Sequence, residues 1–315
     1  MHNNIKSIFV LKTILKNIKN KKKLNIIKHN KKILNRLNIS KEDFEVYDVL
    51  KEFNKKFKLN IDDIDIKELN LGKKSIKTEE LEYLIKIKFN ELKLLFLDDN
   101  ELIDISIFEN ANFKELKNLN LSNNKISHIN VLEKVNFKFL EYLNLSGNTI
   151  LDIEILKNFN FKILKGLRLS NVGILDIKVL EKVKFEKLEI LNLSVNSISD
   201  INIFENVNFK ELKILNLSMN CISDIHAFEK VDFKKLEFLD LSFNKIADIN
   251  ALKKVFFKKL KYLSLACNPI EDIIELENAE FNSDLAFNLK GNRINQKENS
   301  FIINNLKSKI KGLYL

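Results

Sequence analysis

The sequence predicts an α/β solenoid, a curved stack of about ten short coils with parallel strands on the concave face and helices capping the N-terminal end. Three observations predict this fold. Nine phenylalanines recur at an unbroken interval of 24 residues, from Phe89 to Phe281. One pattern, L-x-x-L-x-L-x-x-N-x-I-x-x-I, runs through these intervals. Hydrophobic residues make up 45% of the 315 residues, enough for a continuous core and unlike a disordered or collagen-like chain.

Each interval predicts one short strand. In the coil 209–231, Leu215 and Leu217 are two residues apart, so both lie on one face of a strand, whereas Ile214 and Asn216 lie on the other. The isoleucines that follow turn inward from the returning segment. A single coil cannot bury such a face alone, but stacked coils share one continuous core.

Eight asparagines occupy one column of the repeat. They are Asn100, Asn124, Asn148, Asn196, Asn220, Asn244, Asn268 and Asn292. The whole pattern, over residues 64–295, resembles the leucine-rich repeat family in its intracellular form, which has I-x-D-I-x-x-L after the asparagine. The resemblance implies a structural column, because in that family the buried amide bonds the backbone of adjacent turns. Val172 breaks the column, and we expect a local irregularity there, with Gly173 taking up the strain.

The pattern divides the chain into three parts: a basic helical N-terminal module at 1–60, the solenoid at 61–295, and a C-terminal capping helix at 296–315. The end coils are atypical, as terminal repeats of solenoids are. In the first coil, Lys74 stands where asparagine belongs. After the last coil, Ser300 opens a helical pattern that would cover the exposed end of the core.

The N-terminal module carries the basic charge of a chain whose net charge is +10. It holds 16 Lys and Arg residues against 5 Asp and Glu residues. Ser40 and Asp43 form a capping-box pattern that predicts a helix packed on the first coil. The basic stretch 19–36 could contact nucleic acid or an acidic membrane through phosphates, although it lacks the stacking aromatics of single-strand binders. The alternative is a helical cap with a solvated basic face.

Six apolar residues of this module resemble the F-box family, the short helical domain that docks onto the Skp-type adaptor of cullin ubiquitin ligases. They are Leu11, Ile14, Leu15, Ile18, Leu24 and Ile27. The resemblance implies that these residues bind the adaptor. The leading Leu-Pro and the tryptophan typical of that family are absent here.

The outward positions of the strands form the candidate protein-binding surface. We expect a partner to contact Tyr142, Arg168, Ile190, Asn192, Ile214, Asn216, Met219, Phe238, Asp240, Phe243 and Tyr262. An apolar patch rimmed by polar groups is typical of an interaction site, and aromatic residues and methionine are enriched there. The alternative is that strands simply favour β-branched and aromatic residues. In an interface, Phe238 and Tyr262 would be the anchors.

The pattern offers no catalytic, cofactor or metal site. An aspartate recurs in nearly every coil from Asp104 to Asp272, with His128 in the same register. Such carboxylates could bind calcium, but each is placed to cap the segment that follows it. Cys221 and Cys267 lie two coils apart, too far for a disulfide. No apolar run has the length of a membrane span, and lysines interrupt the first apolar stretch, so no secretory signal is expected.

We therefore expect a non-enzymatic protein-interaction module, without a cofactor, in the cytoplasm or nucleus. The F-box resemblance implies a substrate receptor of a cullin-type ubiquitin ligase. The repeated segment N-x-I-x-D-I also resembles the phosphatase-binding leucine-rich repeat proteins, although the coils of that family are shorter. This resemblance implies a regulatory scaffold. Removing residues 1–37 should abolish the first function and spare the second.

Overall fold

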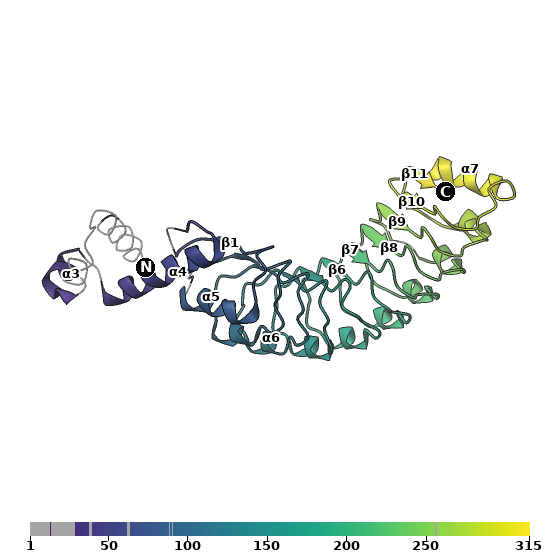
Figure 1. The fold of residues 1–315 in the computed structure, drawn as a ribbon. Helices are drawn as coiled ribbons and strands as arrows, with labels where there is room; N and C mark the ends of the chain where they lie inside the picture. The colour runs from purple at the N-terminus through teal and green to yellow at the C-terminus, as the bar shows by residue number, and fades with distance from the viewer. Residues whose placement is uncertain are drawn as a thin grey trace.

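The computed structural model describes residues 13, 29–37, 40–61, 64–87, 89, 91–255 and 257–315. These residues form one open sheet of eleven parallel strands that follow one another in sequence order. The strands line the inner face of a curved stack, and short helices line the outer face (Figure 1). The predicted α/β solenoid of leucine-rich coils is therefore confirmed.

Each strand is three residues long and pairs in parallel with its neighbours. The strands are β1 (Glu68–Asn70), β2 (Leu94–Phe96), β3 (Asn118–Asn120), β4 (Tyr142–Asn144), β5 (Gly166–Arg168), β6 (Ile190–Asn192), β7 (Ile214–Asn216), β8 (Phe238–Asp240), β9 (Tyr262–Ser264), β10 (Ala286–Asn288) and β11 (Gly312–Tyr314). From β2 to β10 the paired residues are 24 positions apart, as in Ile190 and Ile214. The middle residue of β1 to β10 is buried, so the core runs unbroken through the stack.

The returning segments carry one turn or two of helix each. They are η1 (Thr78–Glu80), α5 (Leu81–Ile87), η2 (Ser106–Asn110), α6 (Val131–Lys134), η3 (Glu154–Asn158), η4 (Lys178–Glu181), η5 (Asn202–Glu205), η6 (His226–Glu229), η7 (Asn250–Lys253) and η8 (Ile274–Asn278). A strand spacing of about 4.8 Å is narrower than a helix of about 10 Å. The helical side of the stack is therefore wider than the strand side, which bends the solenoid with its strands inward.

In the part of the chain that the structure describes, helices α3 (Lys31–Leu37) and α4 (Lys41–Phe57) precede the first coil. The expected capping box is present: the Ser40 hydroxyl accepts from the Asp43 N–H at 3.1 Å, and the Asp43 carboxylate accepts from the Ser40 N–H at 2.8 Å. Phe53 of α4 is fully buried, with its ring centroid 6.0 Å from that of Phe89 in the solenoid. Lys74 donates to the Phe57 carbonyl at 3.0 Å, so it satisfies the end of α4 rather than a preceding coil.

The C-terminal end differs from the sequence prediction. Helix α7 (Ser300–Lys309) begins at the expected residue, but the chain then forms strand β11, which pairs with β10. The sequence predicted only a helix over 296–315 and about ten strands. The available signal was Ile310-x-x-Leu313-x-Leu315, which matches the L-x-x-L-x-L of the coils but follows the preceding strand by 26 rather than 24 residues.

The asparagine column joins consecutive coils. In a typical member, Nδ2 of Asn220 donates to the carbonyls of Leu193 and Leu217, both at 3.0 Å, while its Oδ1 accepts from the Ile198 N–H at 3.0 Å. Its side chain is buried, so these bonds satisfy polar groups that water does not reach.

The column is interrupted at Val172, where the expected irregularity is found. Gly173 has φ +85°, although its counterparts in neighbouring coils are not left-handed, and a Cβ at this position would meet nothing within 4 Å. Among the described residues, the Ile150 N–H has no hydrogen-bond partner, although its counterparts bond an asparagine Oδ1. Valine therefore leaves one buried backbone donor unpaired.

Candidate binding surface on the concave face

Four neighbouring strands place apolar side chains side by side on the concave face. This apolar row consists of Ile190, Ile214, Phe238 and Tyr262, from β6 to β9. Each side chain is half-buried. The rings of Phe238 and Tyr262 are stacked, with centroids 4.7 Å apart and planes inclined by 9°. The two expected anchors therefore form one continuous aromatic surface.

A polar row runs beside the apolar row, at the ends of the same strands. It includes Asn192, Asn216 and Asp240. In each, Oδ1 accepts at 2.9 Å from the backbone N–H two residues further on. These side chains therefore hold the turn that follows the strand. The Nδ2 groups of the two asparagines have no partner among the described residues.

A third column lies in that turn, and its backbone is left-handed. From the sixth strand to the ninth it holds Val195, Met219, Phe243 and Cys267, with φ between 54° and 56°. We call these four residues the loop column. Exposure of the first three is 38%, 50% and 56%. In the four preceding coils the same position holds Asp99, Asn123, Gly147 and Asn171, residue types that tolerate this conformation.

The N-terminal part of the concave face is hollow rather than apolar. Gly166 lies in the strand row between Tyr142 and Ile190. A Cβ at Gly166 would lie 2.6 Å from Cδ1 of Tyr142, so the tyrosine ring lies across the glycine. Beside it is an open hollow of ≈ 240 Å³, lined by Tyr142, Asn144, Gly166 and Arg168 among others. The Arg168 side chain is exposed at its rim.

A ladder of alternating charge borders the strands on the other side, and sequence analysis did not find it. Glu141 accepts from Lys117 at 3.1 Å and from Lys165 at 2.7 Å, and Glu189 accepts from Lys213 at 2.8 Å. Hydrogen bonds from Lys165 and Lys117 lower the pKa of Glu141. The alternation of Lys and Glu at 24-residue steps was the available signal. These charges neutralise one another.

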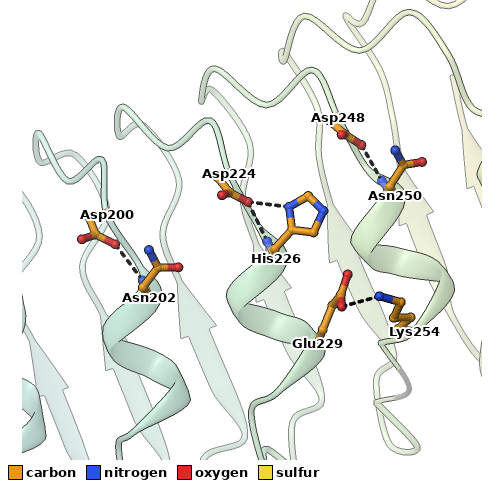
Figure 2. Close-up of polar contacts among 8 residues, drawn as sticks. All are labelled: Asp200, Asn202, Asp224, His226, Glu229, Asp248, Asn250 and Lys254. Carbon is orange, nitrogen blue, oxygen red and sulfur yellow. Dashed lines mark hydrogen bonds and ion pairs between the residues drawn. The ribbon is translucent and has the colours of Figure 1, made fainter.

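The aspartate column lies on the helical side of the stack. Figure 2 shows Asp200, Asp224 and Asp248 each accepting from a backbone N–H at the start of the following helix, at distances of 2.8–2.9 Å. Ring Nδ1 of His226 also lies 2.7 Å from Asp224 Oδ1. That hydrogen bond raises the pKa of His226, and the N–H and ring of His226 lower the pKa of Asp224. The aspartates thus act as helix caps.

The remaining features considered from the sequence do not contribute to this surface. The six residues of the F-box resemblance lie outside the described residues, as does most of the basic stretch 19–36. Within the described part of the chain, no group of His, Cys, Asp or Glu could hold a metal ion. Cys221 and Cys267 are free thiols. None of the described helices is long and apolar enough to cross a membrane.

Two family models match parts of the solenoid. The model described as leucine-rich repeats in two copies matches residues 210–254 and 234–278, and the model of a single leucine-rich repeat matches residues 115–134. No curated protein matches the chain.

Solved structures share the fold. An internalin (inlF) from Listeria monocytogenes is 28% identical with a TM-score of 0.60, covering 74% of this chain and 63% of the internalin chain. A leucine-rich repeat protein from Leptospira interrogans is 25% identical with a TM-score of 0.56, covering 74% and 62%. InlP from Listeria monocytogenes, at 19% identity and a TM-score of 0.59, covers 77% and 72% and is alike in fold alone. The match spans less than two thirds of the first two structures.

Proposed function

Since this chain is a leucine-rich repeat protein, and proteins of this fold are typically non-enzymatic interaction modules, we propose that it binds a protein partner on the concave face. The contact surface consists of the apolar row and the loop column, from β6 to β9. The polar row lies between them, and its asparagines Asn192 and Asn216 supply hydrogen-bond donors. The anchors are the stacked rings of Phe238 and Tyr262.

The observation that carries this proposal is the strain of the loop column. A left-handed backbone costs an ordinary residue about 1–2 kcal/mol, and a β-branched residue such as Val195 is a clear outlier there. The side chains recover only part of this cost inside the chain, because Val195, Met219 and Phe243 remain 38–56% exposed. Strained backbone at an exposed apolar side chain is a feature of binding sites. Asparagine at Asn123 and Asn171 shows the unstrained solution in the same chain.

The test compares two sets of apolar side chains. The first variant replaces Val195, Met219 and Phe243 by Asn; the control replaces Leu151 and Leu175, which are 69% and 71% exposed on another part of the coils, by Ser. Proteins captured from a lysate of the source cell by the full chain are quantified against both variants. We expect the Asn variant to lose specific partners and the control to retain them. Equal retention by both variants would refute the proposal.

The anchors are tested separately, because Phe238 and Tyr262 stand on unstrained strand positions. Replacing both rings by alanine removes the stacked pair while the inward residues Leu239 and Leu263 keep the core. The affinity for a partner identified in the capture experiment should fall by about tenfold or more, as for buried aromatic anchors elsewhere. An unchanged affinity would show that the rings are not part of the contact.

A finer role as substrate receptor of a cullin-type ubiquitin ligase rests on the N-terminal segment. The alternative is a regulatory scaffold of the phosphatase-binding kind. Full-length bait and bait without residues 1–37 distinguish them, since helix α4 packs on the solenoid and remains in both. Capture of a Skp-type adaptor and a cullin by the full-length bait alone would support the receptor. Capture of the same partners by both baits, without ligase subunits, would support the scaffold.

We place this activity inside the cell, in the cytoplasm or nucleus. Cell fractionation with an antibody to the chain tests the location, and recovery of the chain from the culture medium would contradict it.

A further inference from the structure

Arginine is rare in this chain, and one arginine stands on the concave face. Only three of the 53 basic residues are arginines: Arg36, Arg168 and Arg293. Arg168 ends strand β5, in the same row as Asn192. Lysine and arginine differ in chemistry, because the planar guanidinium presents paired donors that fit a carboxylate or phosphate in two parallel hydrogen bonds.

The guanidinium of Arg168 has no anionic partner among the described residues. The neighbouring carboxylates of Glu141 and Glu189 are bonded to lysines of the charge ladder. Arg293, in contrast, pairs with Glu271 at 3.3 Å. Arg168 therefore projects an unneutralised positive charge from the concave face.

The groups around Arg168 are hydrogen-bond donors. Asn144 and Asn192 flank it in the row, and their Oδ1 atoms accept from the N–H groups of Ser146 and Ser194 at 3.1 and 2.9 Å. Among the described residues, the Nδ2 group of each of these asparagines has no partner, so it can donate hydrogen bonds to a ligand. Three donor side chains thus line one stretch of the polar row, which is complementary to anionic oxygens.

The hollow beside Arg168 gives an anionic group space to enter. The Tyr142 ring lies against the buried Gly166, and the hollow opens beside that ring, next to Asn144 and Arg168. The opening measures ≈ 240 Å³.

We propose that Arg168 and this hollow bind a carboxylate of the same protein segment whose apolar side chains pack on the apolar row. The inference rests on the proposed function and specifies the partner: an extended segment with an acidic group at one end. The apolar row begins one strand after Arg168 and spans three strand spacings, about 15 Å. An extended chain advances about 3.3 Å per residue, so the segment has about six residues, with the acid at one end and apolar or aromatic residues along the rest.

The experiment is a selection of displayed random peptides on the full chain. It runs in parallel on the Arg168→Gln variant and on Arg293→Gln, the control for loss of an exposed, paired arginine. We expect peptides that combine Asp or Glu with apolar residues, bound by the full chain and the control. Arg168→Gln should lower their affinity by about tenfold to a hundredfold and remove the enrichment of acidic residues. Arg168→Lys should restore only part of the affinity.

The outcomes separate this inference from the proposed function. Enriched peptides that depend on Phe238 and Tyr262 but show no acidic preference would overturn the carboxylate site and leave the concave interface standing. Failure to enrich any peptide that depends on the two rings would overturn both. Synthetic versions of an enriched peptide, with Asp→Asn, with an amidated C-terminus or with phosphoserine in place of the acid, identify whether the bound anion is a side chain, a chain end or a phosphate.

Discussion

The asparagine column allows a quantitative test at one buried residue. Asn220→Val reproduces in one coil what Val172 does naturally in another. The Ile198 N–H, which donates to Asn220 Oδ1, then loses its only partner. The carbonyls of Leu193 and Leu217 each keep a hydrogen bond, because each also accepts from another asparagine of the column, at 2.9 and 3.0 Å. The damage is therefore concentrated on one backbone donor.

The magnitude follows from this accounting. An unpaired buried donor costs about 1–3 kcal/mol, and each further lost hydrogen bond costs about 1 kcal/mol or less when the acceptor keeps a partner. Part of this loss is offset by the apolar surface that valine buries. We expect Asn220→Val to lower the free energy of unfolding by about 2–4 kcal/mol. Asn292→Val, at the half-exposed end of the column, should cost about 1 kcal/mol, because water can replace its bonds.

The assay combines urea unfolding with amide hydrogen exchange. Exchange is needed because a solenoid can unfold in segments, so one global transition is not assured. Protection should fall at Ile198 and in the coils next to Asn220, and much less at α4. A folded Asn220→Val variant that stays within 1 kcal/mol of the native chain, with protection unchanged at Ile198, would refute the reasoning.

Three further predictions follow from the same structure. Val172→Asn should supply the missing acceptor for Ile150 and raise the free energy of unfolding by about 1 kcal/mol; a loss of stability in urea would contradict this. Glu141→Gln should cost about 1 kcal/mol at neutral pH. Because the two lysines lower the pKa of Glu141, the stability that Glu141 contributes is present above its pKa in the unfolded chain and is lost as pH falls through its pKa in the folded chain. The free energies of unfolding of the variant and the native chain should therefore become equal in acid. Asp224→Asn should lower the pKa of His226 in an NMR titration, because the hydrogen bond to Asp224 raises this pKa. That bond stabilises the fold below the pKa of the imidazole in the unfolded chain, and the stabilisation is lost as pH rises through the pKa in the folded chain. An unchanged titration midpoint would contradict the pairing.

The repeat made the fold predictable from sequence. A 24-residue period with leucines two apart leaves only a stack of strands, and the asparagine column identifies where each strand ends. The irregular backbone beside Val172 was also predictable, because a valine in the asparagine column cannot make the hydrogen bonds that shape the other coils. Strand β11 was missed because its pattern, Ile310-x-x-Leu313-x-Leu315, directly follows a helix and is out of step with the 24-residue period.

The concave surface was predictable in part. The pattern placed the apolar row, since alternate residues of a strand share a face. It did not show that the loop column is left-handed, because φ is a property of the backbone and Val195 or Phe243 by itself favours a right-handed or extended conformation. The signal was present in other coils, where Asn123, Gly147 and Asn171 occupy the same column. This signal is found only when the residues at one position of the repeat are compared from coil to coil.

The strongest argument for one contiguous interface is that two independent columns change at the same coils. The apolar row begins at Ile190 on β6, after Gly166 on β5, and ends at Tyr262 on β9, since the next strand, β10, has the small Ala286 at this position. The loop column begins at Val195, in the coil of β6, and in the coil of β10 the corresponding left-handed position holds Gly291. Strand propensity explains the first change, since β-branched and aromatic residues favour strands. It cannot explain the second, because the same residue types are unfavourable in a left-handed turn. A partner that covers four coils and both columns accounts for both changes together.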